Sequence, residues 1–327
     1  MKRREFITLL GGAAATWPLV ARGQQSDVLV IGFLESGSSA EFKERIDGFR
    51  EGLSRFGYTE GKTIRIEHRF ANGHYEQLPQ LASDLVGRQV AVLVATGSPN
   101  SAQAAQAATQ SIPIVFANGG DPVMLGLVAA VNRPGRNTTG VTFFNSSLAP
   151  KRMELVRELV PQASIAGLLV NPRNPNTDSD VKVLQAAARS IGVEVLILHA
   201  SEESDFASAF AAFNRHRVDA VVVNNDAFFS TQSTRIVEIA ARASLPTIYY
   251  LRSFVAAGVL VSYGTNIVEM YREAGVYTGR ILRGVSPGDL PVLFPSKFEF
   301  AVNLKTAKAL GLAVPTSILL RADEVIE

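Results

Sequence analysis

Short apolar runs alternate with amphipathic segments along most of this chain, and this alternation restricts the possible folds more than any other feature. The run DVLVIGF (27–33) is followed by Phe42, Ile46, Phe49 and Leu53, whose spacing predicts a helix with one buried face. Near-continuous apolar runs are typical of strands that are covered on both faces, as in parallel sheets. The pattern therefore predicts an α/β fold with right-handed crossovers.

The same alternation continues towards the C-terminus. Further strands are expected at residues 62–69, 90–95, 113–117, 138–144, 164–171, 193–198, 218–224 and 245–250. Helices are expected between them at residues 75–86, 99–109, 148–160, 177–190, 203–215 and 229–243. Residues 89–120 and 217–253 repeat one order of elements, which suggests two Rossmann-like lobes of related topology. The alternative explanation is that all α/β folds repeat strand–helix units, so two halves can look alike without a common origin.

Residues 1–23 have the features of an export signal. Lys2, Arg3 and Arg4 precede an apolar run, and Ala21-Arg22-Gly23 places small residues two apart. The apolar run of about 15 residues is shorter than the roughly 20 that a membrane span needs. Arg-Arg-Glu-Phe-Ile resembles the twin-arginine motif, so we expect twin-arginine export and cleavage of this leader. General secretion and an ordinary cytosolic N-terminus are the alternatives.

Charge and cysteine content exclude several classes of function. The chain has 32 basic and 30 acidic residues, but the leader holds four of the basic residues and one acidic residue. The remainder carries about −1, so there is no basic surface for nucleic acid. The chain has no cysteine, which excludes disulfides, thiolate catalysis and a lipid-anchored cysteine. We therefore expect a soluble periplasmic protein without a lipid anchor.

Polar residues follow the predicted strands, where open parallel sheets bind their ligands. The candidate ligand-binding residues are Ser36, Thr96, Gly97, Ser98, Asn118, Gly119, Asn171, Asn174, Asn176, Asn225, Asp226, Tyr249 and Tyr250. Ser98 precedes a helix that begins with Pro99, and the amides of such a terminus attract a carboxylate. Asp226 is placed to hold an ammonium group. Helix capping is the alternative role of both residues, and core packing is the alternative for the tyrosines.

Sequence signatures of common enzymes are missing. The first strand is not followed by GxGxxG, and the chain has no GxxxxGK[ST] phosphate loop and no GxSxG elbow between a strand and a helix. The histidines, His68, His74, His199 and His216, form no pair with metal-ligand spacing. We expect no catalytic residue, no metal and no cofactor.

The stretch IPIVFANGGDPVMLGLVAAVNRPGRNTTGV, with LVNPRNPN, DAVVV and GVLVSYG, resembles the ABC-transporter solute-binding family that includes tryptophan- and other aromatic-amino-acid-binding proteins. The resemblance implies the periplasmic binding protein type I fold, with a small solute captured between two lobes and delivered to an ABC permease. Ligand contacts carried over from the family fall on Thr96, Ser98, Asn118, Asn171, Asn176, Asp226 and Tyr249. The loop ATGSPNS departs from the Thr-Pro-Ala type of tryptophan-binding members, so the solute need not be tryptophan.

The resemblance also implies where the lobes begin and end. The first lobe is expected at 27–143 plus 264–290, and the second at 146–260 plus 291–327. Hinge residues are expected at Phe144, Asn145, Ser262 and Tyr263. We expect a monomer that captures an amino acid or an aromatic carboxylate. A periplasmic sensor that feeds a signalling receptor, and an exported enzyme, are the alternatives.

Overall fold

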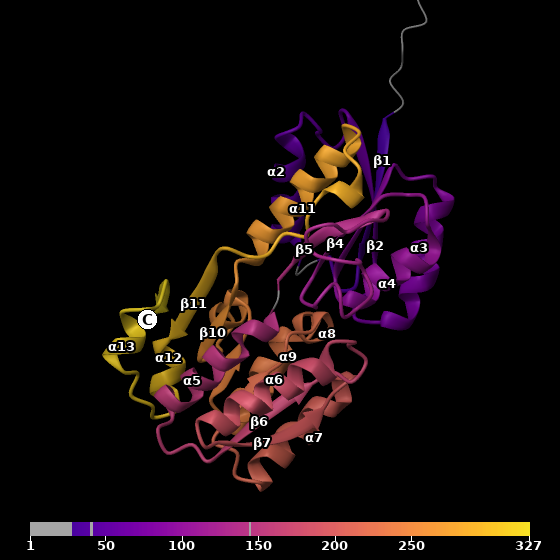
Figure 1. The fold of residues 1–327 in the computed structure, drawn as a ribbon. Helices are drawn as coiled ribbons and strands as arrows, with labels where there is room; N and C mark the ends of the chain where they lie inside the picture. The colour runs from indigo at the N-terminus through magenta and orange to yellow at the C-terminus, as the bar shows by residue number, and fades with distance from the viewer. Residues whose placement is uncertain (1–27, 40–41, 144) are drawn as a thin grey trace, which may run out of the picture.

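The computed structural model describes residues 28–39, 42–143 and 145–327. The export leader expected at residues 1–23 and the expected hinge residue Phe144 lie outside this range. The chain forms two lobes, one above the other in Figure 1, and each lobe is built on a mainly parallel sheet with helices on both faces. The predicted two-lobed α/β fold is confirmed. Over the described part of the chain, none of the helices combines the length and apolar character that crossing a bilayer requires.

The first lobe holds five parallel strands in the order β2-β1-β3-β4-β5. These strands are β1 (Leu29–Glu35), β2 (Ile64–Phe70), β3 (Val92–Gly97), β4 (Ile114–Asn118) and β5 (Thr138–Thr142). The helices α3 (Leu78–Gly87) and α4 (Pro99–Ala108) cover one face, and the short η1 (Tyr75–Gln77) precedes α3. The helices α2 (Lys43–Ser54) and α11 (Ile267–Leu282) cover the other face.

The second lobe holds seven strands in the order β12-β11-β10-β9-β8-β6-β7, and β11 is antiparallel to β10. Its strands are β6 (Ile165–Val170), β7 (Glu194–His199), β8 (Ala220–Val223), β9 (Thr247–Tyr249), β10 (Val261–Thr265), β11 (Phe298–Asn303) and β12 (Glu324–Ile326). One face is covered by α5 (Ala149–Leu159), α6 (Thr177–Ser190) and α12 (Leu304–Ala309). The other is covered by α7 (Glu203–Arg215) and α9 (Ser233–Ala243).

Short helices complete the connections. They are η2 (Asn145–Leu148), α8 (Ala227–Thr231), α10 (Arg252–Ala256), η3 (Pro287–Asp289) and α13 (Thr316–Leu319). The single helix predicted at 229–243 is wrong, because the chain forms α8 and α9 with Gln232 between them. The side chain of Asp226 caps α8 at its start, whereas α9 buries Ile236 and Ala240 on the second sheet. Two different anchors therefore hold the two halves of this segment.

The chain passes between the lobes three times. It leaves the first sheet after β5, returns after β10 to form α11, and leaves again before β11. Leu293 still lies beside Val141 in a parallel bridge with the first sheet, so the last passage falls between Leu293 and Phe298. Ser262 and Tyr263, expected as hinge residues, lie inside β10 and pair with β9 and β11.

Candidate functional site

The carboxyl ends of the two sheets face each other across a crevice, and several hydrogen bonds cross it. The hydroxyl of Tyr75 in the first lobe donates to Asp226 Oδ2 in the second at 2.9 Å, and the amide of Phe228 donates to that hydroxyl at 3.1 Å. Asn100 Nδ2 donates to the carbonyl oxygen of Arg173 at 3.1 Å. The two lobes are therefore in contact along the edges where the sequence predicts a ligand.

An open groove of about 1120 Å³ lies at the mouth of this crevice. Both lobes line it, with Tyr75, Asn100 and Gln103 on one side and Arg173 and Phe228 on the other. None of the thirteen candidate ligand-binding residues is part of its lining. These residues, apart from the half-exposed Gly97 and Asn225, are buried further inside, which separates the site into an outer mouth and an inner polar layer.

Asp226 is the centre of the inner layer on the second lobe. Its carboxylate accepts hydrogen bonds from five donors, which are Tyr75 Oη, Asn171 Nδ2, Asn174 Nδ2 and the amides of Phe228 and Phe229. Burial raises the pKa of Asp226, and the hydrogen bonds from Asn171, Asn174 and Tyr75 oppose that rise. Asp226 therefore caps α8 and connects the lobes, and its oxygens are already occupied by protein donors.

Glu35 has the matching position on the first lobe, at the end of β1. Its carboxylate accepts from Thr96 Oγ1 at 2.6 Å, from the hydroxyl of Tyr271 at 2.9 Å and from the amide of Gly37 at 2.9 Å. Ser36 Oγ donates to the same group at 3.3 Å. Burial raises the pKa of Glu35, whereas the bond from Thr96 lowers it. The predicted residues Ser36 and Thr96 thus hold this carboxylate in place.

Gly97 and Ser98 connect this carboxylate to the start of α4. Gly97 has a φ of +89°, and a Cβ there would collide with Glu35, so only glycine fits this turn. Ser98 is the N-cap of α4, and its hydroxyl accepts from the amide of Asn100 at 3.2 Å. Ser98 therefore has the capping role that is the alternative to ligand binding. Asp121 likewise accepts from the amides of Val123 and Met124 in a turn.

Four polar atoms of buried residues at the crevice have no hydrogen-bond partner among the described residues. They are Asn118 Nδ2, Arg152 Nη2, the hydroxyl of Tyr249 and Ser262 Oγ. Asn118 ends β4 and Tyr249 ends β9, while Ser262 lies opposite Tyr249 in the register of β10. Buried polar groups are almost always hydrogen-bonded, so unpaired ones at a strand edge indicate where a ligand is received.

Aromatic residues also lie at the carboxyl ends of the two sheets. Tyr249 stacks on Phe254 with ring centroids 4.3 Å apart, and Phe143 stacks on Tyr271 at 6.1 Å. The amide of Phe143 donates to the carbonyl oxygen of Asn118, so the backbones of these two residues lie side by side at the end of the first sheet. The ends of the strands at the crevice therefore carry both polar donors and aromatic residues, a combination that is common in sites for small solutes.

The remaining candidates lie at the same edge in supporting positions. Asn174 donates to the carbonyl oxygen of Asn225, Asn176 packs against Gly120 of the first lobe, and the hydroxyl of Tyr250 donates to the carbonyl oxygen of Asp226. Gly119 is buried directly after β4. The structure thus brings the predicted residues to one crevice, although most of those with polar side chains contact other protein groups.

Sequence reasoning missed Tyr75 and Arg152. Tyr75 lies in a short 3-10 helix before α3, which no periodic pattern marks. Arg152 lies in the first turn of α5, where a basic side chain opposes the helix dipole. That unfavourable placement is the one signal of Arg152 that the sequence carries.

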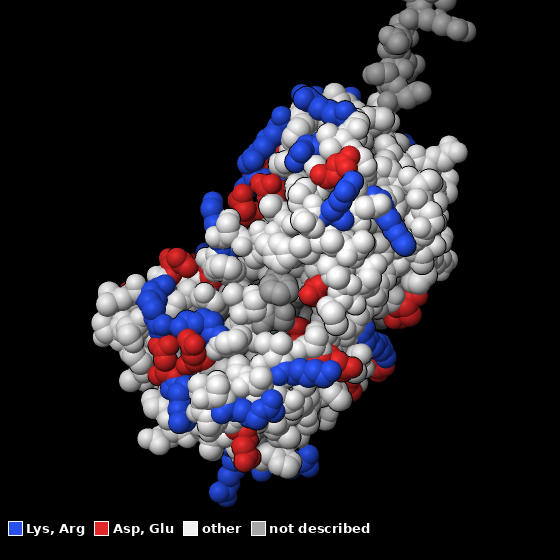
Figure 2. Space-filling view, in the orientation of Figure 1, with Lys and Arg blue, Asp and Glu red and all other residues white. Residues whose placement is uncertain are grey.

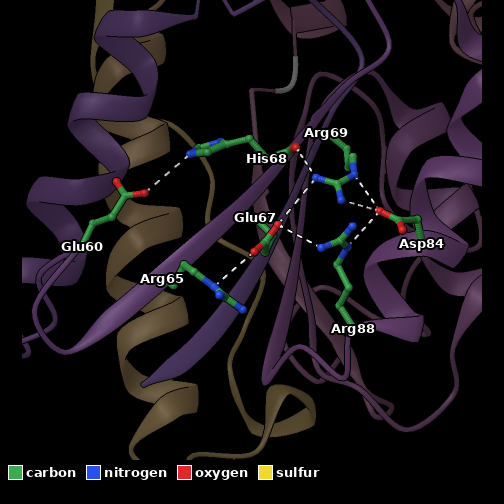
Figure 3. A network of polar contacts seen from close by, with 7 residues as sticks. All are labelled: Glu60, Arg65, Glu67, His68, Arg69, Asp84 and Arg88. Carbon is green, nitrogen blue, oxygen red and sulfur yellow. Dashed lines mark hydrogen bonds and ion pairs between the residues drawn. The ribbon is translucent and has the colours of Figure 1, made fainter. Parts of the chain in front are cut away.

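A second cluster of charged residues lies on the edge strand β2, away from the crevice (Figure 3). Arg69 and Arg88 both contact Asp84 Oδ2, with Nε distances of 2.7 and 3.1 Å, and Arg65 pairs with Glu67 at 3.1 Å. These groups are paired with one another and partly exposed, as is typical of a protected sheet edge.

Over the described residues, no His, Cys, Asp or Glu cluster could hold a metal. Basic and acidic side chains are interspersed over both lobes in Figure 2.

Known proteins resemble this chain over nearly its whole length. A family model described as ABC transporter substrate binding protein matches residues 27–326. A tyrosine-binding protein of Clostridioides difficile is 29% identical over 265 residues, which cover 81% of this chain and 76% of the relative. A conserved domain protein of Vibrio cholerae has a similar structure, with 27% identity, a TM-score of 0.86, and coverage of 91% of this chain and 99% of the other.

Two further solved structures differ in the state of their crevice. An ABC domain of Streptococcus pneumonia in complex with L-Trp has a TM-score of 0.84, with 25% identity, and covers 91% of this chain and 99% of its own. A ligand-free, open substrate-binding protein of Clostridium difficile has a TM-score of 0.67, with 26% identity, and covers 92% and 99%. Because the two identities are almost equal, the difference in TM-score indicates that the lobes of this chain are arranged more like those of the L-Trp complex than like those of the open structure.

Proposed function

The chain belongs to the family of ABC transporter substrate-binding proteins, and we propose that its solute is an aromatic amino acid or a related aromatic carboxylate. It has the two-lobed fold of periplasmic binding proteins, and its role is not enzymatic. The unpaired donors at the crevice carry this proposal. Asn118, Tyr249 and Ser262 each present a buried polar atom that no described residue satisfies. A solute between the lobes would receive hydrogen bonds from both sheets at once.

The aromatic part of the proposal has two supports. Tyr249 carries one of the unpaired atoms on its own ring, and the hydroxyl of Tyr271 donates to Glu35 at the carboxyl end of the first sheet. The relatives described above include one named for tyrosine binding and one solved with L-Trp. Flat rings that stack on these side chains would add packing energy beyond the area that they bury.

Closure of the lobes would complete the site. The bonds from Tyr75 to Asp226 and from Asn100 to Arg173 exist only while the lobes are in contact. A solute that contacts both lobes selects this closed state, because it gains contacts there that the open state lacks. The three chain passages, after Thr142, after Thr265 and after Leu293, are the proposed hinges.

The setting of this activity is also part of the proposal. The leader with its twin-arginine motif supports export to the periplasm, where the chain would work as a monomer without a lipid anchor. Membership of the family supports delivery of the solute to an ABC permease in the inner membrane.

A thermal-shift screen followed by calorimetry tests this function. The probes are aromatic amino acids, aromatic carboxylates, aliphatic amino acids, aliphatic carboxylates and neutral sugars. A ligand at 100 times its Kd should stabilise the fold by about 2.7 kcal/mol. We expect this stabilisation from aromatic amino acids or aromatic carboxylates. Stabilisation by sugars or aliphatic compounds alone would contradict the proposal.

A further inference from the structure

Arg152 is a fully buried arginine of the second lobe, and its charge is felt by Tyr250, whose hydroxyl donates to the carbonyl oxygen of the crevice residue Asp226. Arg152 is the fourth residue of α5, and only 1% of its surface is exposed. Its Nε donates to the carbonyl oxygen of Tyr263 in β10 at 3.0 Å. This bond fixes the guanidinium beside β10, the strand that also carries the unpaired hydroxyl of Ser262.

No described residue satisfies the charge of this guanidinium. Its Nη2 has no hydrogen-bond partner, and Arg152 forms no ion pair within 4.0 Å in the described part of the chain. A buried charge without a counter-ion is strongly unfavourable, and burial lowers the pKa of Arg152 to about 10. The helix dipole of α5 also opposes a cation in its first turn. An anion is therefore the missing partner.

The carboxylates around Arg152 do not supply that anion. Asp180 is the nearest acidic neighbour in electrostatic terms, but it lies beyond ion-pair distance and accepts from Asn224 Nδ2 at 2.9 Å. Burial raises the pKa of Asp180 to about 6, so ionisation of this carboxyl is less favourable than in water, and its hydrogen bond comes from Asn224 and not from Arg152. Tyr250 and Tyr263 are the other acidic groups that act on Arg152.

Acceptors at the crevice are occupied, whereas donors are free. Glu35 accepts four hydrogen bonds and Asp226 accepts five. The unpaired atoms include donors on Asn118, Arg152 and Tyr249. This imbalance suits a solute that is rich in acceptors and carries negative charge, and it leaves little capacity for an ammonium group.

We propose that Arg152 binds the carboxylate of the solute, and that the crevice accepts aromatic carboxylates whether or not they carry an α-amino group. The proposal rests on the proposed function and narrows its solute class. Arg152 gives the carboxylate a planar fork of donors, a geometry that a lysine does not reproduce.

Calorimetry with three matched probes tests which solute group is required. The probes are L-tyrosine, its analogue without the amino group, 3-(4-hydroxyphenyl)propionate, and its analogue without the carboxylate, tyramine. The wild-type chain should bind the first two with similar affinity and tyramine at least about 10-fold more weakly, because a hydrogen-bonded charge is lost.

Variants of Arg152 test which residue receives the group. Arg152→Gln should weaken binding of both carboxylates about 10- to 100-fold, and Arg152→Lys should fall between Gln and the wild type. The control is Lys151→Gln, the adjacent residue, which pairs with Glu154 at the surface and should leave affinity unchanged. Thermal unfolding without solute checks each fold. A purely structural Arg152 would lower the Tm without changing affinity for the carboxylates relative to tyramine.

The outcomes separate this inference from the proposed function. Tight binding of tyramine, or wild-type affinity of Arg152→Gln for the carboxylates, would overturn the role of Arg152 and leave an aromatic solute in place. Binding of aliphatic carboxylates alone, lost in Arg152→Gln, would support Arg152 and reject the aromatic solute. If sugars or amines alone bind the wild type, both proposals are rejected. Should Arg152→Gln not fold, the ratio of affinities for carboxylate and tyramine in Arg152→Lys decides the question.

Discussion

Tyr249 and Asp226 are both buried at the crevice, but only Asp226 has its side-chain oxygens hydrogen-bonded to protein groups. Asp226 receives five protein donors, so the structure of the second lobe depends on it. The hydroxyl of Tyr249 has no partner among the described residues, so the fold gains nothing from it. Residues of the second kind are the best candidates for contact with the solute.

Tyr249→Phe should reduce affinity without reducing stability. Removal of an unpaired buried hydroxyl leaves the Tm unchanged or slightly higher, whereas a lost hydrogen bond to the solute weakens binding up to about 10-fold. The control is Tyr277→Phe in the first lobe, whose hydroxyl donates to the carbonyl oxygen of Pro291 at 2.6 Å. That variant should lose stability and keep its affinity. Calorimetry and thermal unfolding of both variants provide the comparison.

Asp180 should make the stability of the solute-free chain depend on pH. Its pKa rises from 3.8 to about 6 on folding because of burial, so its contribution to stability is present below pH 4 and is lost as the pH rises through 6. Asp180→Asn should therefore be more stable than the wild type at pH 7.5, by up to about 3 kcal/mol, and equal to it at pH 3.5.

Urea unfolding at several pH values measures this difference, with the exposed neighbour Asp178→Asn as the control. A loss of stability in Asp180→Asn at pH 7.5 would contradict the prediction. It would also make Asp180 the counter-ion of Arg152, and would thereby weaken the case for a carboxylate of the solute at that position.

The helices α2 and α11 come from opposite ends of the chain and pack closely in the first lobe (Figure 1). The contact depends on glycines, because a Cβ on Gly52 would collide with the carbonyl oxygen of Arg272 and one on Gly275 with that of Phe49. The helix α11 lies between the second and the third passage of the chain between the lobes. Its packing against α2 therefore fixes the position of both hinges relative to the first lobe.

Gly52→Ala should force α2 and α11 apart and destabilise the chain by about 1–3 kcal/mol or more. The matched control is Gly87→Ala at the end of α3, where an added Cβ meets nothing within 4 Å. The control should be neutral or slightly stabilising, because alanine favours the helix. Equal stability of Gly52→Ala and the wild type in urea unfolding would show that the two helices do not depend on this contact.

The sequence contains enough information for the elements but not for every contact of the site. The helices expected at 177–190 and 203–215 have the same bounds in the structure, because their apolar periodicity reflects the face that they bury. The break at Gln232 depends on the cap from Asp226, which periodicity does not report. Tyr75 contacts Asp226 from a distance of 151 residues, so only the folded chain identifies the bond between them.

Among the described residues, hydrogen bonds of Tyr75 and Asn100 join the two lobes across the crevice. Tyr75 donates to Asp226 and accepts from the amide of Phe228, and both partners belong to the other lobe. Tyr75→Phe removes these bonds from the closed state and none from the open state. Affinity should fall about 10-fold because closure becomes less favourable, while the thermal stability of the solute-free chain changes little. Tyr58→Phe is the control in the same lobe, outside the crevice. Equal affinity of Tyr75→Phe and the wild type in calorimetry would exclude Tyr75 from closure.

A distance measurement between the lobes tests the central claim that a solute closes the crevice. The chain has no cysteine, so Lys62→Cys and Lys182→Cys give one exposed spin-label site on each lobe without further changes. Pulsed electron–electron double resonance should report a shift to a shorter and narrower distribution of distances between the two spin labels when the solute identified by calorimetry is added at saturation. An unchanged distribution with the solute fully bound would contradict the account, because binding would then not require the two lobes to close around it.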